Sequence, residues 1–186
     1  SSKYDKVKEK MGVLPKEFLS LHQPHNSTVY KHAKLYLNKR GITREDILKY
    51  DIGYCEEGLY SNRIIIPSYD EDGQLNFFVG RDIFESKMKY RNSPTHKDII
   101  GFDLFINWDE PIVLCEGPFD AIAIKRNTIP LFGKTIPDQL KHRIIENNVK
   151  VIYICLDQDA RKQAIETAEY FMANGVDVYF VDLKEK

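Results

Sequence analysis

Carboxylates follow two apolar runs of the chain, in positions where they could bind a divalent cation. The run 112–115 leads directly into Glu116, and the run 151–156 leads into Asp157 and Asp159. Continuous apolar runs are typical of strands buried in a parallel sheet, and ligands gather at the carboxyl ends of such strands. Clustered carboxylates repel one another unless a cation lies among them, and oxygen ligands suit Mg²⁺ or Mn²⁺. We therefore expect a metal site for phosphoryl transfer at these acids.

A fourth carboxylate, Asp120, follows Glu116 by four residues, in the first turn of an expected helix. Two of the four acids also have a structural interpretation. Asp120 can stabilise the N-terminus of its helix, and Asp159 can serve as an N-cap. Glu116 ends an apolar strand, where burial of a lone charge is costly. The functional interpretation therefore depends most on Glu116.

The elements that position these acids alternate regularly after residue 110. We expect strands at 112–115, 128–132, 149–156 and 176–181, and helices at 118–126, 137–147 and 160–173. Strands of continuous apolar character that alternate with helices predict a parallel sheet covered on both faces.

The earlier part of the chain reads as a smaller mixed α+β region. A helix is expected from the capping residues 26–28 to Arg40, and a second one opens at Thr43 with Ile47 and Leu48 facing inward. The β-rich runs 63–67 and 74–80 flank a turn that ends in glycine and predict a hairpin. Residues 82–110 are expected to be mostly irregular and contain a basic cluster at 87–91, which would by itself be interpreted as a solvated loop.

Composition sets the class of protein. The chain has 186 residues, 42% apolar and 30% charged, which excludes a disordered, fibrous or membrane-spanning protein. The net charge of −1 combines 17 basic and 14 acidic residues up to residue 100 with 10 and 14 after it. The three cysteines form no CxxC pair, so no zinc ribbon is expected. No apolar run of membrane-spanning length and no signal-peptide pattern is present, which predicts a cytoplasmic protein.

The acids and several upstream motifs resemble the catalytic core of bacterial or phage DnaG-type primases, which contains a Toprim domain. The Toprim signature, a Glu after one strand and Asp-x-Asp after a later one, is matched by LCEGPFD at 114–120 and DQD at 157–159. Residues 37–54 resemble the family's "YL..RG...E...F.IGY" segment, and residues 63–81 its "R..FPI...G...GF.GR" hairpin. KYRNSP at 89–94 resembles the "KY.NSP" motif.

The resemblance implies an α/β fold in which a Toprim-like parallel sheet flanked by helices, at 110–186, follows a small mixed α+β subdomain at 1–109. It implies a nucleotidyltransferase, a DNA-directed RNA polymerase that makes short RNA primers from NTPs on a single-stranded DNA template during replication. Mg²⁺ or Mn²⁺, without zinc, is the expected cofactor. Further expected partners are the RNA–DNA hybrid product and a replicative helicase, the latter bound through a region that this sequence lacks; no membrane is expected. The expected location is the cytoplasm of a bacterium or a phage-infected host.

The resemblance also assigns roles residue by residue. Glu116, Asp157 and Asp159 are the expected catalytic metal ligands, with Asp120 in support. Residues expected to face the nucleotide or the nucleic acid are Arg63, Arg81, Lys89, Tyr90, Asn92 and Arg161.

The sequence departs from the family where Gln158 and Lys162 replace the glycines of the "DGDxAG" motif. A further acidic pair of the family is expected just beyond Lys186. Two alternative functions stay open. A Mg-dependent Toprim nuclease would share the acids but would not need the 89–94 motif. A non-catalytic Mg-binding α/β module would leave everything before residue 100 unexplained.

Overall fold

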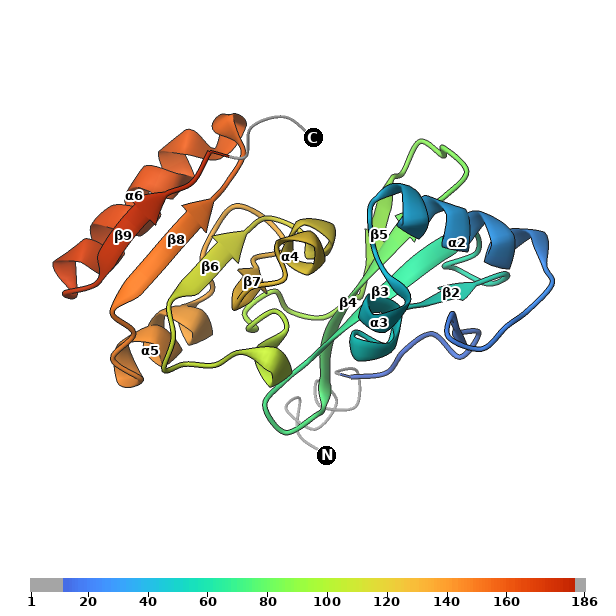
Figure 1. Cartoon of the computed structure of the whole chain (residues 1–186), viewed down its shortest axis with the longest axis horizontal. Coiled ribbons are helices and arrows are strands. Elements are labelled where there is room, and N and C mark those ends of the chain that lie inside the picture. The colour runs from blue at the N-terminus through green and yellow to red at the C-terminus, as the bar shows by residue number, and fades with distance from the viewer. Residues whose placement is uncertain (1–11, 183–186) are drawn as a thin grey trace. The chain divides into compact units, whose positions relative to one another are not determined.

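The computed structural model describes residues 12–182, and the chain divides into two compact units. The first unit takes in the chain up to Tyr69 together with Gly73–His96. The second takes in Asp70–Asp72 and the chain from Lys97 onward. Each unit contains its own sheet, antiparallel in the first and parallel in the second (Figure 1). The expected combination of a mixed α+β region and a parallel α/β region is confirmed. The acidic pair expected beyond Lys186 lies outside the described residues.

The first unit contains a five-stranded sheet in the order β1-β2-β3-β4-β5. Its strands are β1 (Leu19–Ser20), β2 (Gly53–Cys55), β3 (Arg63–Tyr69), β4 (Leu75–Asp82) and β5 (Tyr90–Asn92). β3 and β4 form the expected hairpin, in which Ile64 pairs with Arg81 and Ile66 with Val79. The turn contains Gly73 at φ 78°, a left-handed conformation that glycine adopts without strain.

Two helices accompany this sheet, α2 (Thr28–Lys39) and α3 (Arg44–Lys49). Ser27 caps α2 by accepting a hydrogen bond from the N–H of Tyr30 at 3.1 Å. Thr43 and Asp46 form a capping box at the start of α3, each side chain accepting from the other's backbone N–H. Both helices begin at the caps that the sequence predicted.

The prediction that Ile47 and Leu48 both face inward is wrong for Leu48. Ile47 is 3% exposed, whereas Leu48 is 63% exposed. Successive residues of a helix point about 100° apart, so the inward side of this short helix takes in Ile47 and only one of its two neighbours. In α3 the second buried position is Asp46, whose carboxylate belongs to the capping box.

The expectation of irregular structure after residue 82 is wrong for β5, which pairs antiparallel with β4. Gly80 pairs with Arg91, and Arg81 pairs with Tyr90. Gly80 permits this approach, because a Cβ at that position would lie 2.5 Å from the carbonyl oxygen of Arg91. A three-residue strand is too short to show a period of two, so its pairing depends on the edge that β4 presents.

The second unit contains a four-stranded parallel sheet in the order β7-β6-β8-β9. Its strands are β6 (Ile112–Cys115), β7 (Thr128–Pro130), β8 (Val151–Cys155) and β9 (Asp177–Phe180). Its helices are α4 (Pro118–Ile124), α5 (Asp138–Glu146) and α6 (Arg161–Ala173), with 3-10 turns η1 (Asp103–Phe105) and η2 (Gln158–Ala160). Every strand and helix expected after residue 110 is present.

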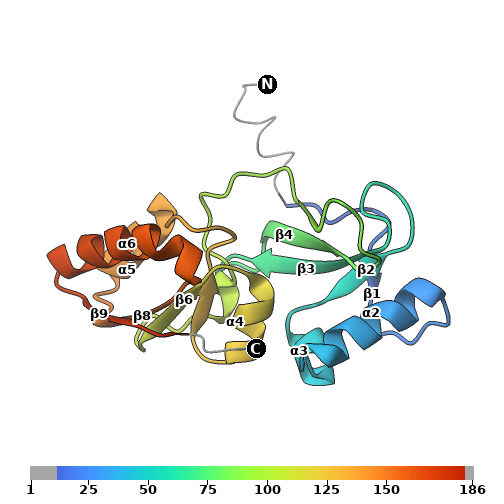
Figure 2. The same ribbon diagram turned by 90° about the horizontal axis from the view of Figure 1, so that it is seen from above.

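Helices α5 and α6 lie together on one face of the parallel sheet, and α4 lies on the other (Figure 2). The main core forms on the α5 and α6 side, where Ile144 and Phe171 pack with Leu114 and Ile152. The α4 side is less fully covered. There the rings of Tyr153 and Tyr179 stack with centroids 5.5 Å apart, and Tyr179 is 53% exposed.

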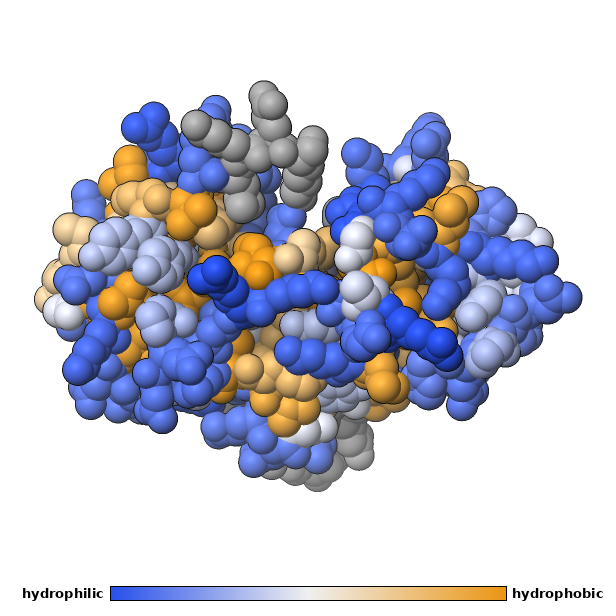
Figure 3. Space-filling view, viewed as in Figure 1, coloured by the Kyte–Doolittle hydropathy of each residue, from blue (hydrophilic) through white to orange (hydrophobic). Residues whose placement is uncertain are grey.

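Hydrophilic side chains cover most of the face shown in Figure 3, as expected for a chain with 30% charged residues. In the part of the chain that the structure describes, no helix has both the length and the apolar character needed to cross a bilayer.

Candidate functional site

Two strands of the parallel sheet end side by side, and each is followed by an acid. Cys115, the last residue of β6, is the register partner of Cys155, the last residue of β8. Glu116 follows β6 directly, and Asp157 follows β8 after one residue. The backbone N–H of Asp157 donates a hydrogen bond to Oε1 of Glu116 at 3.4 Å. The pairing of β6 with β8 therefore brings together acids that are 41 residues apart in the sequence.

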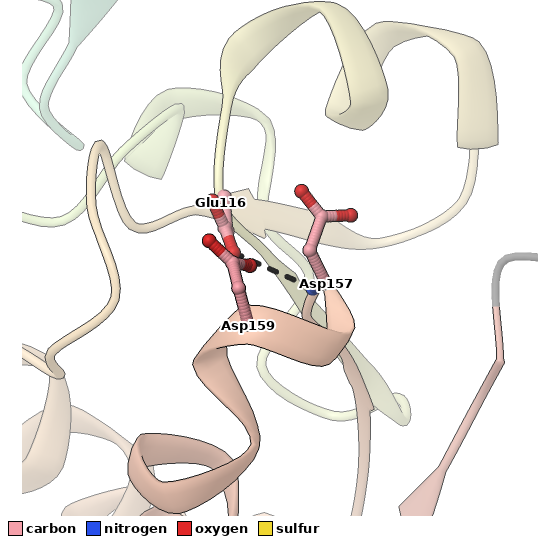
Figure 4. A group of neighbouring side chains, drawn as sticks. All are labelled: Glu116, Asp157 and Asp159. Carbon is pink, nitrogen blue, oxygen red and sulfur yellow. Dashed lines mark hydrogen bonds between the residues drawn. The ribbon is translucent and has the colours of Figure 1, made fainter.

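A third acid joins them because the chain turns immediately after β8. The 3-10 turn η2 begins after Asp157 and contains Asp159. One carboxylate oxygen each from Glu116, Asp157 and Asp159 lies within 4.8 Å of the others, and the three side chains are drawn in Figure 4. We call these three residues the acidic cluster.

The donor set of the acidic cluster fits a hard divalent cation. All three groups offer oxygen, and the spacing of their oxygens allows one ion to contact more than one carboxylate. Glu116 is only partly exposed, while Asp157 and Asp159 are open to solvent, which leaves room for water and phosphate oxygens. Burial, followed by the negative charges of Asp157 and Asp159, raises the pKa of Glu116. Repulsion of this kind is what a bound cation would relieve.

Lys134 also reaches the acidic cluster, and the sequence analysis missed it. Its Nζ lies 2.6 Å from Oδ2 of Asp159. The hydrogen bond from Lys134 lowers the pKa of Asp159, and the same contact raises the pKa of Lys134. Lys134 belongs to the loop after β7, a strand parallel to β6, so this loop leaves the sheet at the same carboxyl edge as the acids. The position of Lys134 after a strand that ends at this edge was the sequence signal that could have identified it.

The structure places the other two predicted residues of this unit near the acidic cluster in sequence but outside it. Asp120 lies in the first turn of α4, and its charge contributes to the raised pKa values of the buried thiols of Cys115 and Cys155, for which burial is the larger cause. Arg161 is exposed and is the first residue of α6.

In the first unit, Arg63 is buried and holds a loop in place. Its Nη1 donates to the carbonyl oxygens of Gly80 and Lys89, each at 3.1 Å, and its Nη2 donates to that of Met88 at 2.8 Å. Burial lowers the pKa of Arg63, and the negative charge of Asp82 opposes that shift. The guanidinium therefore fixes the chain between β4 and β5 at the residues just before Tyr90.

Arg81 presents a different environment, lined by aromatic rings. Its guanidinium carbon lies 4.9 Å from the centre of the Tyr90 ring and 5.7 Å from that of Tyr36. Its Nε is buried and, among the residues that the structure describes, has no hydrogen-bond partner. The guanidinium carbon of Arg40 also lies 4.9 Å from the centre of the Tyr36 ring. Cations and aromatic rings thus alternate across α2, β4 and β5, a combination suited to stacked bases and phosphates.

The remaining predicted residues lie on and beside β5. The side chains of Lys89 and Tyr90 are exposed, and Asn92 is half-buried. Asn92 accepts a hydrogen bond from the hydroxyl of Tyr60 at 3.4 Å through its backbone carbonyl, while its side-chain oxygen finds no partner within the described ranges. Together with Arg81 these residues form what we call the β5 surface: Arg81, Lys89, Tyr90 and Asn92.

Several known proteins are similar to this chain in sequence. No family model matches the chain. The sequence is 30% identical to "Uncharacterized protein MG010" of Mycoplasma genitalium over 168 residues, which cover 83% of this chain and 76% of that protein. It is 25% identical to the DNA primase of Thermotoga maritima over 174 residues, covering 69% of this chain and 31% of the primase. With the DNA primase of Clostridium acetobutylicum the identity is 26% over 208 residues, with coverages of 87% and 34%. The chain thus spans about a third of the length of these primases.

Solved structures share the fold. A DnaG primase catalytic domain bound to single-stranded DNA matches 98% of this chain and 73% of its own, with a TM-score of 0.74 and 22% identity. A DNA primase domain from Pseudomonas aeruginosa matches 98% of this chain and 70% of its own, with a TM-score of 0.75 and 22% identity. Both likenesses extend across the two units. The chain therefore belongs to one family with the Mycoplasma genitalium protein and corresponds, in sequence and fold, to the catalytic core of DnaG-type DNA primases.

Proposed function

We propose that this chain is the catalytic core of a DNA primase, which polymerises NTPs into short RNA primers on a single-stranded DNA template. The observation that carries the proposal is the acidic cluster at the carboxyl edge of a parallel sheet, on a fold shared with primase catalytic domains. In this proposal the metal-binding Toprim domain spans residues 110–186 and the subdomain that contacts template and nucleotide spans residues 1–109.

Glu116, Asp157 and Asp159 would hold the divalent cation, Mg²⁺ or Mn²⁺, with Asp120 nearby on α4. A cation in this position neutralises phosphate oxygens and lowers the pKa of an attacking hydroxyl. The protein's own contribution is geometric. The pairing of β6 with β8 fixes Glu116 against Asp157, and η2 turns Asp159 back toward both, so the ligands are positioned before substrate arrives.

The β5 surface would contact the polyanionic ligands. Exposed Lys89 offers a charge for a phosphate, Tyr90 a ring for stacking, and Arg81 a guanidinium charge beside two aromatic rings. Arg63 would act through this surface by holding the carbonyls of Met88 and Lys89. Arg161, exposed at the start of α6, is the candidate for a phosphate contact beside the acidic cluster. The DNA-bound primase structures support a nucleic-acid partner for this fold. An RNA–DNA hybrid product and a helicase partner belong to the same proposal.

The test is RNA synthesis by the full chain on single-stranded DNA with NTPs and Mn²⁺ or Mg²⁺. We expect short RNA products that disappear with a chelator and with Asp157→Asn, which removes one ligand charge at constant size. The matched control is Asp177→Asn, since Asp177 is exposed and begins β9 at the opposite edge of the sheet. Equal synthesis by both variants would contradict the proposal. Metal-dependent degradation of DNA without RNA synthesis would assign a nuclease instead.

A further inference from the structure

The loop between β7 and α5 places a cation of the protein inside its own candidate metal centre. Lys134 and Asp159 are 25 residues apart in the sequence, yet Nζ and Oδ2 lie 2.6 Å from each other. β7 pairs parallel to β6, so the loop that follows β7 starts at the edge where Glu116 lies. Neither side chain is buried: Lys134 is 37% exposed and Asp159 is 69% exposed.

This contact occupies a carboxylate oxygen of the acidic cluster that could otherwise bind a metal. The acidic cluster has three carboxylates, and the ammonium group of Lys134 neutralises one of them. An oxygen in a short contact with an ammonium group is not free to coordinate a metal ion through the same lone pair. Coordination through that lone pair of Oδ2 therefore requires Lys134 to move away, and the ammonium charge opposes a divalent cation at Asp159 whichever lone pair binds it.

The surroundings of Lys134 allow that movement. The same loop borders a cavity of about 440 Å³ within the second unit, lined in part by Lys97, Phe132, Gly133 and Thr135. Lysine carries its charge on a flexible four-carbon stem, so the ammonium group can leave Asp159 without displacing the backbone.

We propose that Lys134 is a positioning residue of the metal centre, which holds Asp159 in place while no metal is bound and competes with the divalent cation for it. The inference rests on the metal-binding part of the proposed function. If Lys134 acts in this way, the metal affinity is lower than three carboxylates without a neighbouring lysine would give. The side chain of Asp159 is also already oriented when the cation arrives.

The experiment measures Mn²⁺ binding to the full chain by calorimetry and by loss of the free-ion EPR signal. For Lys134→Met we expect roughly tenfold tighter binding than for the wild type, the effect of removing one unit charge about 5 Å from a divalent ion in water. Lys134→Arg keeps the charge and should stay close to the wild-type affinity. Lys150→Met is the matched control, because Lys150 is exposed and directly precedes β8, at the opposite edge of the sheet.

A second comparison assigns the effect to the contact with Asp159. In an Asp159→Asn background, Lys134→Met should change Mn²⁺ affinity by clearly less than tenfold. The inference is overturned if Lys134→Met and Lys150→Met bind Mn²⁺ equally, or if no variant binds it at all. Binding that follows the predicted order without RNA synthesis by the wild type would support the role of Lys134 while refuting the proposed polymerase function.

Discussion

Replacing Glu116 with glutamine removes one negative charge from the acidic cluster and keeps the size of the side chain. Glu116 faces two carboxylates whose oxygens lie within 4.8 Å of its own. At that separation each repulsion is worth about 0.9 kcal/mol in water. Burial raises the pKa of Glu116 most and the two acids raise it further, while the charge of Lys134 lowers it, so attraction to Lys134 offsets part of the repulsion. We expect the metal-free Glu116→Gln variant to be more stable than the wild type by about 1 kcal/mol, or about 2–4 °C in Tm.

The order of stability of the variant and the wild type should reverse when metal is present. A cation at one hundred times its Kd stabilises the folded protein by about 2.7 kcal/mol, which raises the Tm of a chain of this length by roughly 5–10 °C. Glu116→Gln loses a ligand and should gain much less, so the wild type becomes the more stable protein. Thermal unfolding followed by circular dichroism, with a chelator and then with Mn²⁺, measures both differences. Glu166→Gln, on the exposed face of α6, is the matched control and should follow the wild type under both conditions.

The effect depends on pH with a definite sign. The pKa of Glu116 is raised in the folded protein, so its contribution to stability is fully present below the usual value of 4.5 and is lost as pH rises through the raised pKa. The metal-free difference between Glu116→Gln and the wild type should therefore be small near pH 4 and complete at neutral pH. A variant that is less stable than the wild type at neutral pH without metal, or that gains equally from Mn²⁺, would refute the like-charge account of the acidic cluster.

Four further results are expected. Lys89→Ala should weaken binding of single-stranded DNA and lower its salt dependence by about one unit of slope, measured by fluorescence anisotropy at several salt concentrations; an unchanged slope would remove Lys89 from the β5 surface's contacts. Arg63→Met should cost about 2–5 kcal/mol in urea unfolding, because three carbonyls lose their donor, and Arg63→Lys should recover only part of it. Ile47→Ala should cost about 2–4 kcal/mol, whereas Leu48→Ala should stay within about 0.5 kcal/mol of the wild type; similar losses would contradict their opposite exposures. Burial raises the pKa of Cys55 to about 12, so a thiol reagent at pH 8 should label it in the unfolded protein only.

The sequence predicted most of the second unit because its strands and helices alternate regularly and differ clearly in pattern. Apolar runs such as 112–115 specify buried strands, while Pro118 at the start of α4 and Gly175 just after α6 mark helix ends. The acids could be located for the same reason, since Glu116 and Asp157 follow strands whose carboxyl ends must share an edge in a parallel sheet. The lysine at that edge was missed because Lys134 follows a short strand and has no motif of its own, although the same topological rule applies to it.

The first unit was harder to predict because its important contacts are tertiary. Nothing in the local sequence around Tyr90 signals a strand, and β5 exists because β4 offers an edge and Gly80 offers space. The position of Arg63 shows the same limit. The resemblance to primases assigned it to the nucleotide or nucleic acid, whereas in the structure its guanidinium donates to backbone carbonyls, which no sequence pattern records.

The central claim is that Glu116, Asp157 and Asp159 form the divalent-metal centre of a primase core. Crystals of the full chain soaked in Mn²⁺ test it most directly through the anomalous scattering of manganese. The account predicts an anomalous peak among the three carboxylates, coordinated by at least two of them. A peak elsewhere in the molecule with none at the acidic cluster, at Mn²⁺ concentrations that support RNA synthesis, would contradict it.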